Sequence, residues 1–371
     1  MLLAFRVKVV YPQMPQVSAD IQGDLSCQWR FRTWSLDARC CLLALKHMDS
    51  ITSQLSTLIV LFRDVCLPIV VLFGTGWALD RKFKFDMPTL VRLNIYLFVP
   101  AFIFVKVTEA QLDTRTGLKI ILFTLASIAC MGFVSTATAR WFRDDLATRK
   151  SLQLSTMFYN CGNYGIPLMS LAFPVEGPLV QVFVLMTMNV STFTLGLFIA
   201  HSSLGAGTGH WKESLGPVFR QPAIYAIALA WIFKGLDVPV QRAVFLWRPL
   251  EYLAEGLVGF ALITLGVQLS KTKVKGLRGP LTQSLVIRLL GGPCIGILLT
   301  WLFGFEGKTA AILILGTAAP SAVNTALLAY EFKANSQFAA ATVFYTTLLS
   351  ILVVTFLLGV MAFGWIPWAR F

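Results

Sequence analysis

Two short polar stretches interrupt otherwise apolar segments, and they hold the residues whose types and spacing could perform chemistry. The first lies in 151–174, where NCGNYGIP places Asn160, Asn163, Gly165 and Pro167 within eight residues. Glycine has a low helix propensity, and proline removes a backbone donor and clashes with the preceding turn. Irregular backbone in hydrocarbon occurs only where it is buried in protein or lines a cavity, so this stretch is typical of a broken transmembrane helix.

The second stretch lies in 308–330 and repeats these features. Pro320 is near its centre, with a glycine and a threonine before it and Ser321, Asn324 and Thr325 after it. Two interrupted membrane segments, one in each half of a chain, indicate a transporter site between inverted repeats. Two ordinary proline-kinked helices are the alternative, since proline is common in membrane helices. Asparagine and glycine beside the proline in both segments favour the transporter interpretation.

Broken helices of this kind could bind an anion. Proline suits the first helical position, so we expect a new helix to begin after each proline. Its free N–H groups would point at the break, where the helix dipole places about half a positive charge. Asparagine amides could donate further hydrogen bonds to a carboxylate, or they could only satisfy carbonyl groups freed at the break. The candidate substrate-binding residues are Asn160, Asn163, Gly165, Pro167, Pro320 and Asn324.

The composition excludes several classes of protein. The chain has 371 residues, of which 56% are hydrophobic and 13% charged, and its mean hydropathy is +0.71. Repeated apolar runs of about 20 residues indicate a polytopic helical membrane protein. The net charge of +13 does not indicate a nucleic-acid partner, because the basic residues lie in short loops between apolar runs. The seven cysteines form no CxxC pair and the three histidines no cluster, so we expect neither an enzyme nor a cofactor or metal site.

The apolar runs predict an all-α fold with ten transmembrane helices after Met48. The fourth and the ninth are the broken ones. The predicted spans cover about 57–79, 88–106, 117–139, 151–173, 178–200, 218–236, 244–270, 281–303, 308–330 and 337–363.

The loop charges predict the orientation of these spans. The loops after odd-numbered spans hold 14 basic residues, and the loops and tail on the other side hold 8. The positive-inside rule therefore places the first set in the cytoplasm and both ends of the ten-span unit outside. The first set is Arg81, Lys82, Lys84, Arg140, Arg143, Arg149, Lys150, Lys212, Arg220, Lys271, Lys273, Lys275, Arg278 and Lys333. The second is Lys106, Arg115, Lys119, Lys234, Arg242, Arg248, Lys308 and Arg370.

Five spans per half predict two repeats, of which the second must insert upside down. We expect a first repeat in 48–200, a cytoplasmic linker in 201–217 and a second, inverted repeat in 218–371. Residues 1–47 do not fit this plan and are expected to be a poorly structured extension or not the native start, with an amphipathic surface segment as the alternative.

Three stretches resemble the auxin efflux carrier family, and in particular its bacterial malate or malonate permease-like members. They are LNIYLFVPAFIF at 93–104, NCGNYGIPL at 160–168 and APSAVNTALLAYEF at 319–332. The resemblance covers about 55–365. It implies two inverted five-helix repeats, crossing helices 4 and 9, and an organic anion carried by an elevator-like movement of spans 3–5 and 8–10 against a scaffold of spans 1, 2, 6 and 7.

The resemblance also assigns roles to individual residues. The crossover prolines of the family fall on Pro167 and Pro320, and the substrate-facing asparagine of its fourth helix falls on Asn160. The long cytoplasmic loop of many plant members is missing, which favours a small carboxylate such as a dicarboxylate over auxin.

We therefore expect a secondary carrier of small organic anions in the inner cell membrane, with the lipid bilayer as its surroundings and a homodimer as an open possibility. A sodium-coupled symporter of the bile-acid type and a sensor that binds ligand without transport are the alternatives. Sodium dependence of uptake would separate the first alternative from the carrier, and absence of flux would separate the second.

The charge bias generates a test of topology. A reporter fused after Phe371 should report an extracytoplasmic location, because the loops richer in basic residues hold the opposite side in the cytoplasm. Alkaline phosphatase and green fluorescent protein fusions at this position measure the two outcomes. A fluorescent, phosphatase-inactive fusion would contradict the ten-span prediction.

Overall fold

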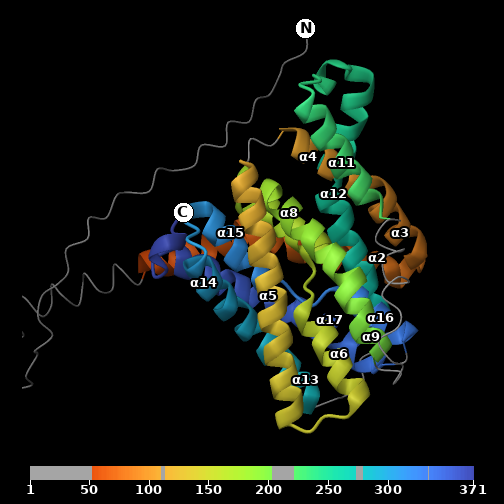
Figure 1. The fold of residues 1–371 in the computed structure, drawn as a ribbon, viewed down its shortest axis with the longest axis vertical. Coiled ribbons are helices and arrows are strands. Elements are labelled where there is room, and N and C mark those ends of the chain that lie inside the picture. The colour runs from red at the N-terminus through yellow and green to blue at the C-terminus, as the bar shows by residue number, and fades with distance from the viewer. Residues whose placement is uncertain (1–51, 110–112, 203–220, 273–278, 333) are drawn as a thin grey trace, which may run out of the picture. The chain divides into compact units, whose positions relative to one another are not determined.

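The structure is a computed structural model that describes residues 52–109, 113–202, 221–272, 279–332 and 334–371 (Figure 1). These residues lie in one compact unit, Ser50–Phe371. The part of the chain that the structure describes is helical and contains no strand, apart from one isolated antiparallel bridge. The predicted all-α class is therefore confirmed. Residues 1–47 and most of the predicted linker lie outside the described residues, so the structure does not test the expectations for them.

The helices follow the predicted apolar runs. The α-helices are α2 (Leu67–Phe83), α3 (Met87–Leu93), α4 (Val99–Glu109), α5 (Thr114–Trp141), α6 (Leu146–Met157), α7 (Ile166–Ala172), α8 (Glu176–Ser191), α9 (Leu197–His201), α11 (Pro222–Gly235), α12 (Val244–Lys271), α13 (Gly279–Val286), α14 (Gly292–Leu302), α15 (Gly307–Thr317), α16 (Val323–Glu331) and α17 (Ser336–Ala362). Wide π-type turns join several of them: η1 (Phe62–Cys66), η2 (Asn94–Phe98), η3 (Cys161–Gly165), η4 (Thr192–Gly196) and η7 (Ile287–Gly291). Two short 3₁₀ turns are η6 (Val240–Arg242) and η8 (Pro367–Ala369).

Seven continuous helical segments in the described ranges are long and apolar enough to cross a membrane. The chain is thus a multi-pass membrane protein. Two further apolar helices are shorter, α11 and α15, and the segment from α6 to α7 is interrupted. The seven long segments are Thr52–Phe83, Met87–Glu109, Arg115–Trp141, Glu176–His201, Val244–Lys271, Gly279–Leu302 and Ser336–Ala362.

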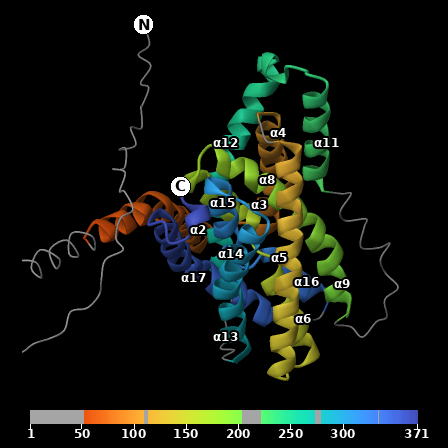
Figure 2. The same ribbon diagram turned by 60° about the vertical axis from the view of Figure 1, so that its left-hand side comes forward.

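The described helices pack as two groups (Figures 1 and 2). In one group α2 packs along α12, and α4 packs along both α11 and α12. In the other group α5 packs on α6, α8 and α14, while α17 packs on α6, α13 and α16. The interrupted segments belong to the second group, and η3 and α7 also touch α12 of the first.

Four prolines inside the spans follow a widened turn and do not end the helix. Four of the π turns are followed by a proline two residues after their last residue. A proline cannot donate to the helix and its ring displaces the carbonyl group one turn back, so the turn relaxes to the wider spacing. In each case the residue before the proline donates to the carbonyl five residues back, as seen in Leu67 to Phe62, Val99 to Asn94, Ile166 to Cys161 and Gly292 to Ile287.

Glycines bring α2 and α12 into close contact. A Cβ atom on Gly266 would overlap the carbonyl oxygen of Phe73, and one on Gly76 would overlap that of Ile263. Small residues commonly allow such close approach between membrane helices, where dispersion and not the hydrophobic effect drives packing. The contact therefore depends on the absence of side chains at these two positions.

This packing predicts a difference between two glycines of the same helix. Gly266→Ala should lower the free energy of unfolding by about 1–3 kcal/mol, because the added methyl group forces α2 and α12 apart. Gly259→Ala is the matched control, since nothing lies within 4 Å of a Cβ atom at that position. The control should be neutral or stabilising by up to about 1 kcal/mol. Thermal unfolding in detergent measures both, and equal effects would contradict the packing argument.

Candidate functional site

The two breaks lie against each other and form hydrogen bonds between their backbones. The N–H group of Asn160 donates to the carbonyl of Pro320 over 2.7 Å, and the N–H group of Ala322 donates to the carbonyl of Phe158 over 2.9 Å. These bonds make the antiparallel bridge between Tyr159 and Ser321. The crossing thus satisfies backbone groups that a continuous helix would have satisfied internally.

Arg288 satisfies the carbonyl groups at the ends of both first half-helices. This side chain lies on η7 and is only 1% exposed. Its Nη1 donates to the carbonyl of Thr156 over 2.9 Å, its Nε donates to that of Ala319 over 3.1 Å, and its Nη2 donates to that of Thr317. The guanidinium group therefore ties the C-terminal end of α6 to that of α15.

Side chains from neighbouring helices satisfy other groups at the crossing. Thr346 on α17 accepts a hydrogen bond from the N–H group of Ser321 at its Oγ1, over 3.1 Å. Gln181 on α8 donates from its Nε2 to the carbonyl of Cys161 over 2.7 Å. Both side chains are buried, so these two backbone groups at the crossing are paired by protein side chains.

Only one of the two second half-helices begins after its proline, as the sequence predicted for both. The first begins at Cys161, six residues before Pro167, and is helical through Ala172. Its N-cap is Asn160, whose Oδ1 accepts from the N–H group of Asn163 over 3.1 Å. The second, α16, begins at Val323, three residues after the proline of its break. The difference arises because Pro167 widens the turn before it, while the backbone bridge and Arg288 hold the chain open at the crossing.

A cavity of about 630 Å³ extends from this crossing toward one end of the helices. Its wall is mostly apolar and carries amide and hydroxyl groups, and among the described residues it contains no Lys or Arg. The cavity is lined by Met87, Pro88, Val91, Asn94, Ile95, Val99, Tyr159, Asn160, Cys161, Gly162, Asn163, Leu185, Met188, Asn189, Thr192, Phe193, Gln221, Ala223, Gln268, Ala322, Val323, Asn324, Leu327, Leu328 and Glu331.

The cavity brings together half of the predicted site residues. Asn160, Asn163 and Asn324 all line it. Pro320 contributes its carbonyl to the bridge and is not part of the lining. Pro167 is buried behind the lining and has no part in it, and neither does Gly165, where a Cβ atom would collide with the amide of Gln181.

Asn160 carries an unpartnered donor. The side chain is 7% exposed, and its Oδ1 is used for the cap, so the remaining amide nitrogen, Nδ2, is the donor left over. This nitrogen has no hydrogen-bond partner among the described residues. A buried donor without a partner costs about 1–3 kcal/mol, which a bound acceptor would recover.

Two residues of the site were not predicted from the sequence. Asn94, on η2, donates from its Nδ2 to the Oδ1 of Asn163 over 2.6 Å and lines the cavity. Arg288 was visible only as a charge within a predicted span. Polar residues at membrane depth are costly and usually functional, and this signal could have identified both. Their partners depend on which helices lie side by side, which the sequence did not specify.

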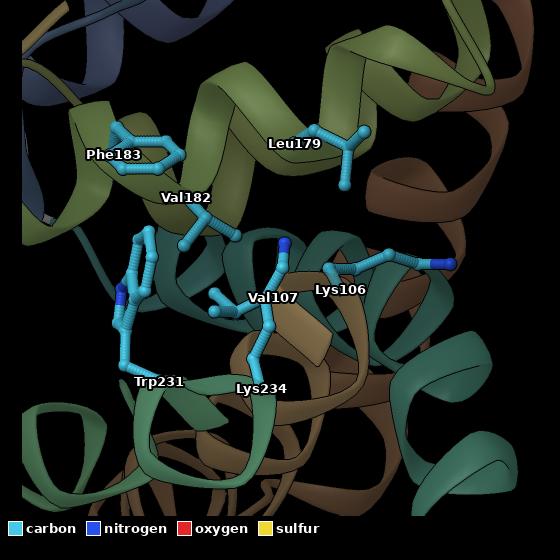
Figure 3. Close-up of a pocket in the computed structure, with 7 residues that line it drawn as sticks. All are labelled: Lys106, Val107, Leu179, Val182, Phe183, Trp231 and Lys234. Atoms are coloured by element: carbon cyan, nitrogen blue, oxygen red, sulfur yellow. The ribbon is translucent and has the colours of Figure 1, made fainter. Parts of the chain in front are cut away.

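A second, smaller hollow lies near the opposite ends of the same helices. There, side chains of α4, α8 and α11 leave a hollow of about 10 Å³, lined by Lys106, Val107, Leu179, Val182, Phe183, Trp231 and Lys234 (Figure 3). Such a volume holds about one water molecule. Figure 3 shows Lys234 extending toward α8, while Lys106 points away and pairs with Glu109 over 2.9 Å. The hollow at this end is thus far smaller than the cavity at the crossing.

Comparisons with known proteins agree with these features. Residues 211–358 match the model of a family described as membrane transport protein. The chain is 25% identical over 305 residues to an "Uncharacterized transporter" of Methanothermobacter thermautotrophicus, with 82% of this chain and 96% of the relative covered. It is 23% identical over 313 residues to a "Putative malonate transporter" of Rhizobium meliloti, covering 81% of this chain and 96% of the relative.

The second half of the chain is thus similar to a family of membrane transport proteins. The match confirms the resemblance found in the broken-helix stretches, because the matched region includes the whole second break. The transporter names of the relatives and the apolar helices agree with each other, and they indicate a transporter and not an enzyme.

The polar groups at the crossing of this transporter generate a stability prediction. Thr346→Val should lower the free energy of unfolding by about 1–3 kcal/mol more than Thr347→Val does, since only the first leaves the N–H group of Ser321 unpaired. Thr347 is a matched control, because it is equally buried on α17 and donates only to the carbonyl of Val343. Thermal or denaturant unfolding in detergent measures the difference. Equal losses for the two variants would show that the bond to Ser321 contributes nothing.

Proposed function

We propose that this transporter is a secondary carrier of small organic anions, and that the anion binds where the two broken helices cross. The observation that carries the proposal is the buried, unpartnered amide nitrogen of Asn160 in the cavity wall. It lies at the start of the helical segment 161–172, and the start of α16 is part of the same wall. Helix N-terminal ends and amide donors are suited to a carboxylate.

The proposed binding residues are those that the cavity brings to the crossing. Asn160 would donate from Nδ2, and Asn324 lies one residue into α16, within the wall. Asn163 lines the cavity with its Oδ1 already bonded to Asn94, which leaves its own amide nitrogen for the substrate. Gly165, Pro167 and Pro320 would act by shaping the crossing and not by contact.

The helix packing supports two inverted repeats, 48–200 and 218–371, each with a broken fourth helix. The group formed by α2, α4, α11 and α12 would be the scaffold, and the group with the crossing would be the moving part. The bond between Asn94 and Asn163 joins the two groups and would have to break during an elevator-like movement. Such a bond is worth about 0.5–1.5 kcal/mol net, so it does not prevent the movement.

The open end of the cavity supports an inward-facing state. Its outer lining includes Met87 and Glu331, which adjoin the loops that hold more basic residues. The positive-inside rule places those loops in the cytoplasm of an inner cell membrane. The small hollow near Lys234 would then face outward.

The chemistry of the wall and one relative support the proposed class of substrate. Amide donors without a basic side chain suit a carboxylate that keeps part of its hydration. One relative is named as a putative malonate transporter, which favours a small dicarboxylate. We therefore choose malonate as the first probe.

The proposal predicts a selective effect of Asn160→Ser. Serine keeps an oxygen for the N-cap but lacks the amide donor, so the helix should still begin at Cys161. Loss of a hydrogen bond to a charged ligand costs about 1.5–3 kcal/mol, so malonate affinity should fall about 10- to 150-fold. Isothermal titration of purified protein and flux into proteoliposomes measure the effect.

The controls separate the competing functions. Asn189→Ser changes another asparagine of the same cavity and should alter malonate affinity by less than about threefold. Malonate binding without flux would favour a sensor, and flux that requires sodium would favour a sodium-coupled symporter. If Asn160→Ser binds malonate as the parent does, the crossing is not the binding site. If the parent binds no member of a panel of mono- and dicarboxylates, the proposed substrate class is wrong.

A further inference from the structure

Four helix ends meet at the crossing, and their charges nearly cancel. The C-terminal ends of α6 and α15 each carry about half a negative charge, and the N-terminal ends at Cys161 and Val323 each carry about half a positive charge. The sum is close to zero. The helix N-terminal ends alone therefore give the crossing little net attraction for an anion.

Arg288 changes this balance of charge, because it pairs with the C-terminal helix ends and not with the N-terminal ones. Two of its three hydrogen bonds go to the carbonyls of Thr156 and Thr317, which belong to the last turns of α6 and α15. The third goes to Ala319 within the break. A unit positive charge placed there offsets the two negative ends and leaves the two positive ends uncompensated.

Tyr159 separates Arg288 from the cavity. The guanidinium carbon lies 5.0 Å from the centre of the Tyr159 ring, and Tyr159 itself lines the cavity beside Asn160. Arg288 is 1% exposed and is not part of the lining, so it does not touch a molecule in the cavity. Among the described lining residues the charged side chain is Glu331, at the far end of α16 and of opposite sign.

We propose that Arg288 supplies the positive potential of the anion site without contacting the substrate. It is a positioning residue that holds the two half-helix ends together and neutralises them, so that the N-terminal ends act on the cavity unopposed. This inference rests on the proposed function for its biological meaning. The potential itself is a property of the protein and can be measured without a substrate.

The measurement uses charged thiol reagents at a cysteine placed in the cavity wall. The seven cysteines are replaced by serine, and Val323→Cys supplies one thiol at the first residue of α16. The ratio of labelling rates for a sulfonate-bearing and a trimethylammonium-bearing methanethiosulfonate reports the local potential. Met87→Cys, also in the cavity wall but on another helix, is the position control.

Two variants of Arg288 separate charge from hydrogen bonding. Arg288→Lys keeps the charge but loses the planar fork of donors, whereas Arg288→Gln keeps two donors and loses the charge. At Val323→Cys the anion-to-cation ratio should stay within about twofold of the parent in Arg288→Lys. It should fall about three- to thirtyfold in Arg288→Gln, as expected when a unit charge is removed near a partly desolvated site. At Met87→Cys both changes should be smaller.

The outcomes decide the proposal. An unchanged ratio in Arg288→Gln would overturn it, as would a tenfold fall in a correctly inserted Arg288→Lys. If the Gln variant does not reach the membrane, the Lys variant alone still decides, because it carries the charge. The malonate affinity measured by titration should decrease in the order parent, Arg288→Lys, Arg288→Gln. A parent that binds no malonate would count against the proposed function, and the labelling ratio would still test the role of Arg288.

Discussion

Two breaks in the helices at membrane depth expose backbone groups that hydrocarbon cannot satisfy, and the rest of the structure depends on how these groups are paired. Asn160 and Pro320 exchange one hydrogen bond across the crossing, and Phe158 and Ala322 exchange another. Arg288 and the side chains of Thr346 and Gln181 pair most of what remains. Since each unpaired group would cost several kcal/mol in lipid, neither break is stable without the other.

The same pairing explains why the crossing can be both rigid and open. The C-terminal half-helix ends are bound to Arg288, so the carbonyl side of the crossing is closed by protein. The N-terminal side faces the cavity, where Asn160 uses its oxygen for the helix and keeps its nitrogen free. The arrangement thus leaves an amide donor of Asn160 in the cavity wall, beside the amide oxygens of Asn94 and Gln268.

The crossing adjoins a large cavity toward one end of the helices and only a small hollow lies near their other end. The same helices that line the cavity near Asn94 and Gln221 line this small hollow beside Lys106 and Lys234. Because Asn94 reaches Asn163 through a single hydrogen bond, the crossing is joined to the helices α2, α4, α11 and α12 by contacts that one movement could exchange. A carrier needs this combination of a paired crossing and an exchangeable interface.

The sequence by itself determined the membrane class, the positions of the apolar helices and the two breaks, because hydropathy and the backbone chemistry of glycine and proline act locally. It also predicted Asn160, Asn163 and Asn324 as candidate binding residues, since amides at membrane depth are rarely without a role, and all three line the cavity. It placed the start of the second half-helix of the first break wrongly, because Pro167 widens a turn while that helix begins six residues earlier, at Cys161; the start of α16 does follow Pro320. Only the tertiary structure showed that Asn94 reaches Asn163 and that Arg288 binds both half-helix ends, since these contacts join residues 29 to 132 positions apart in the chain.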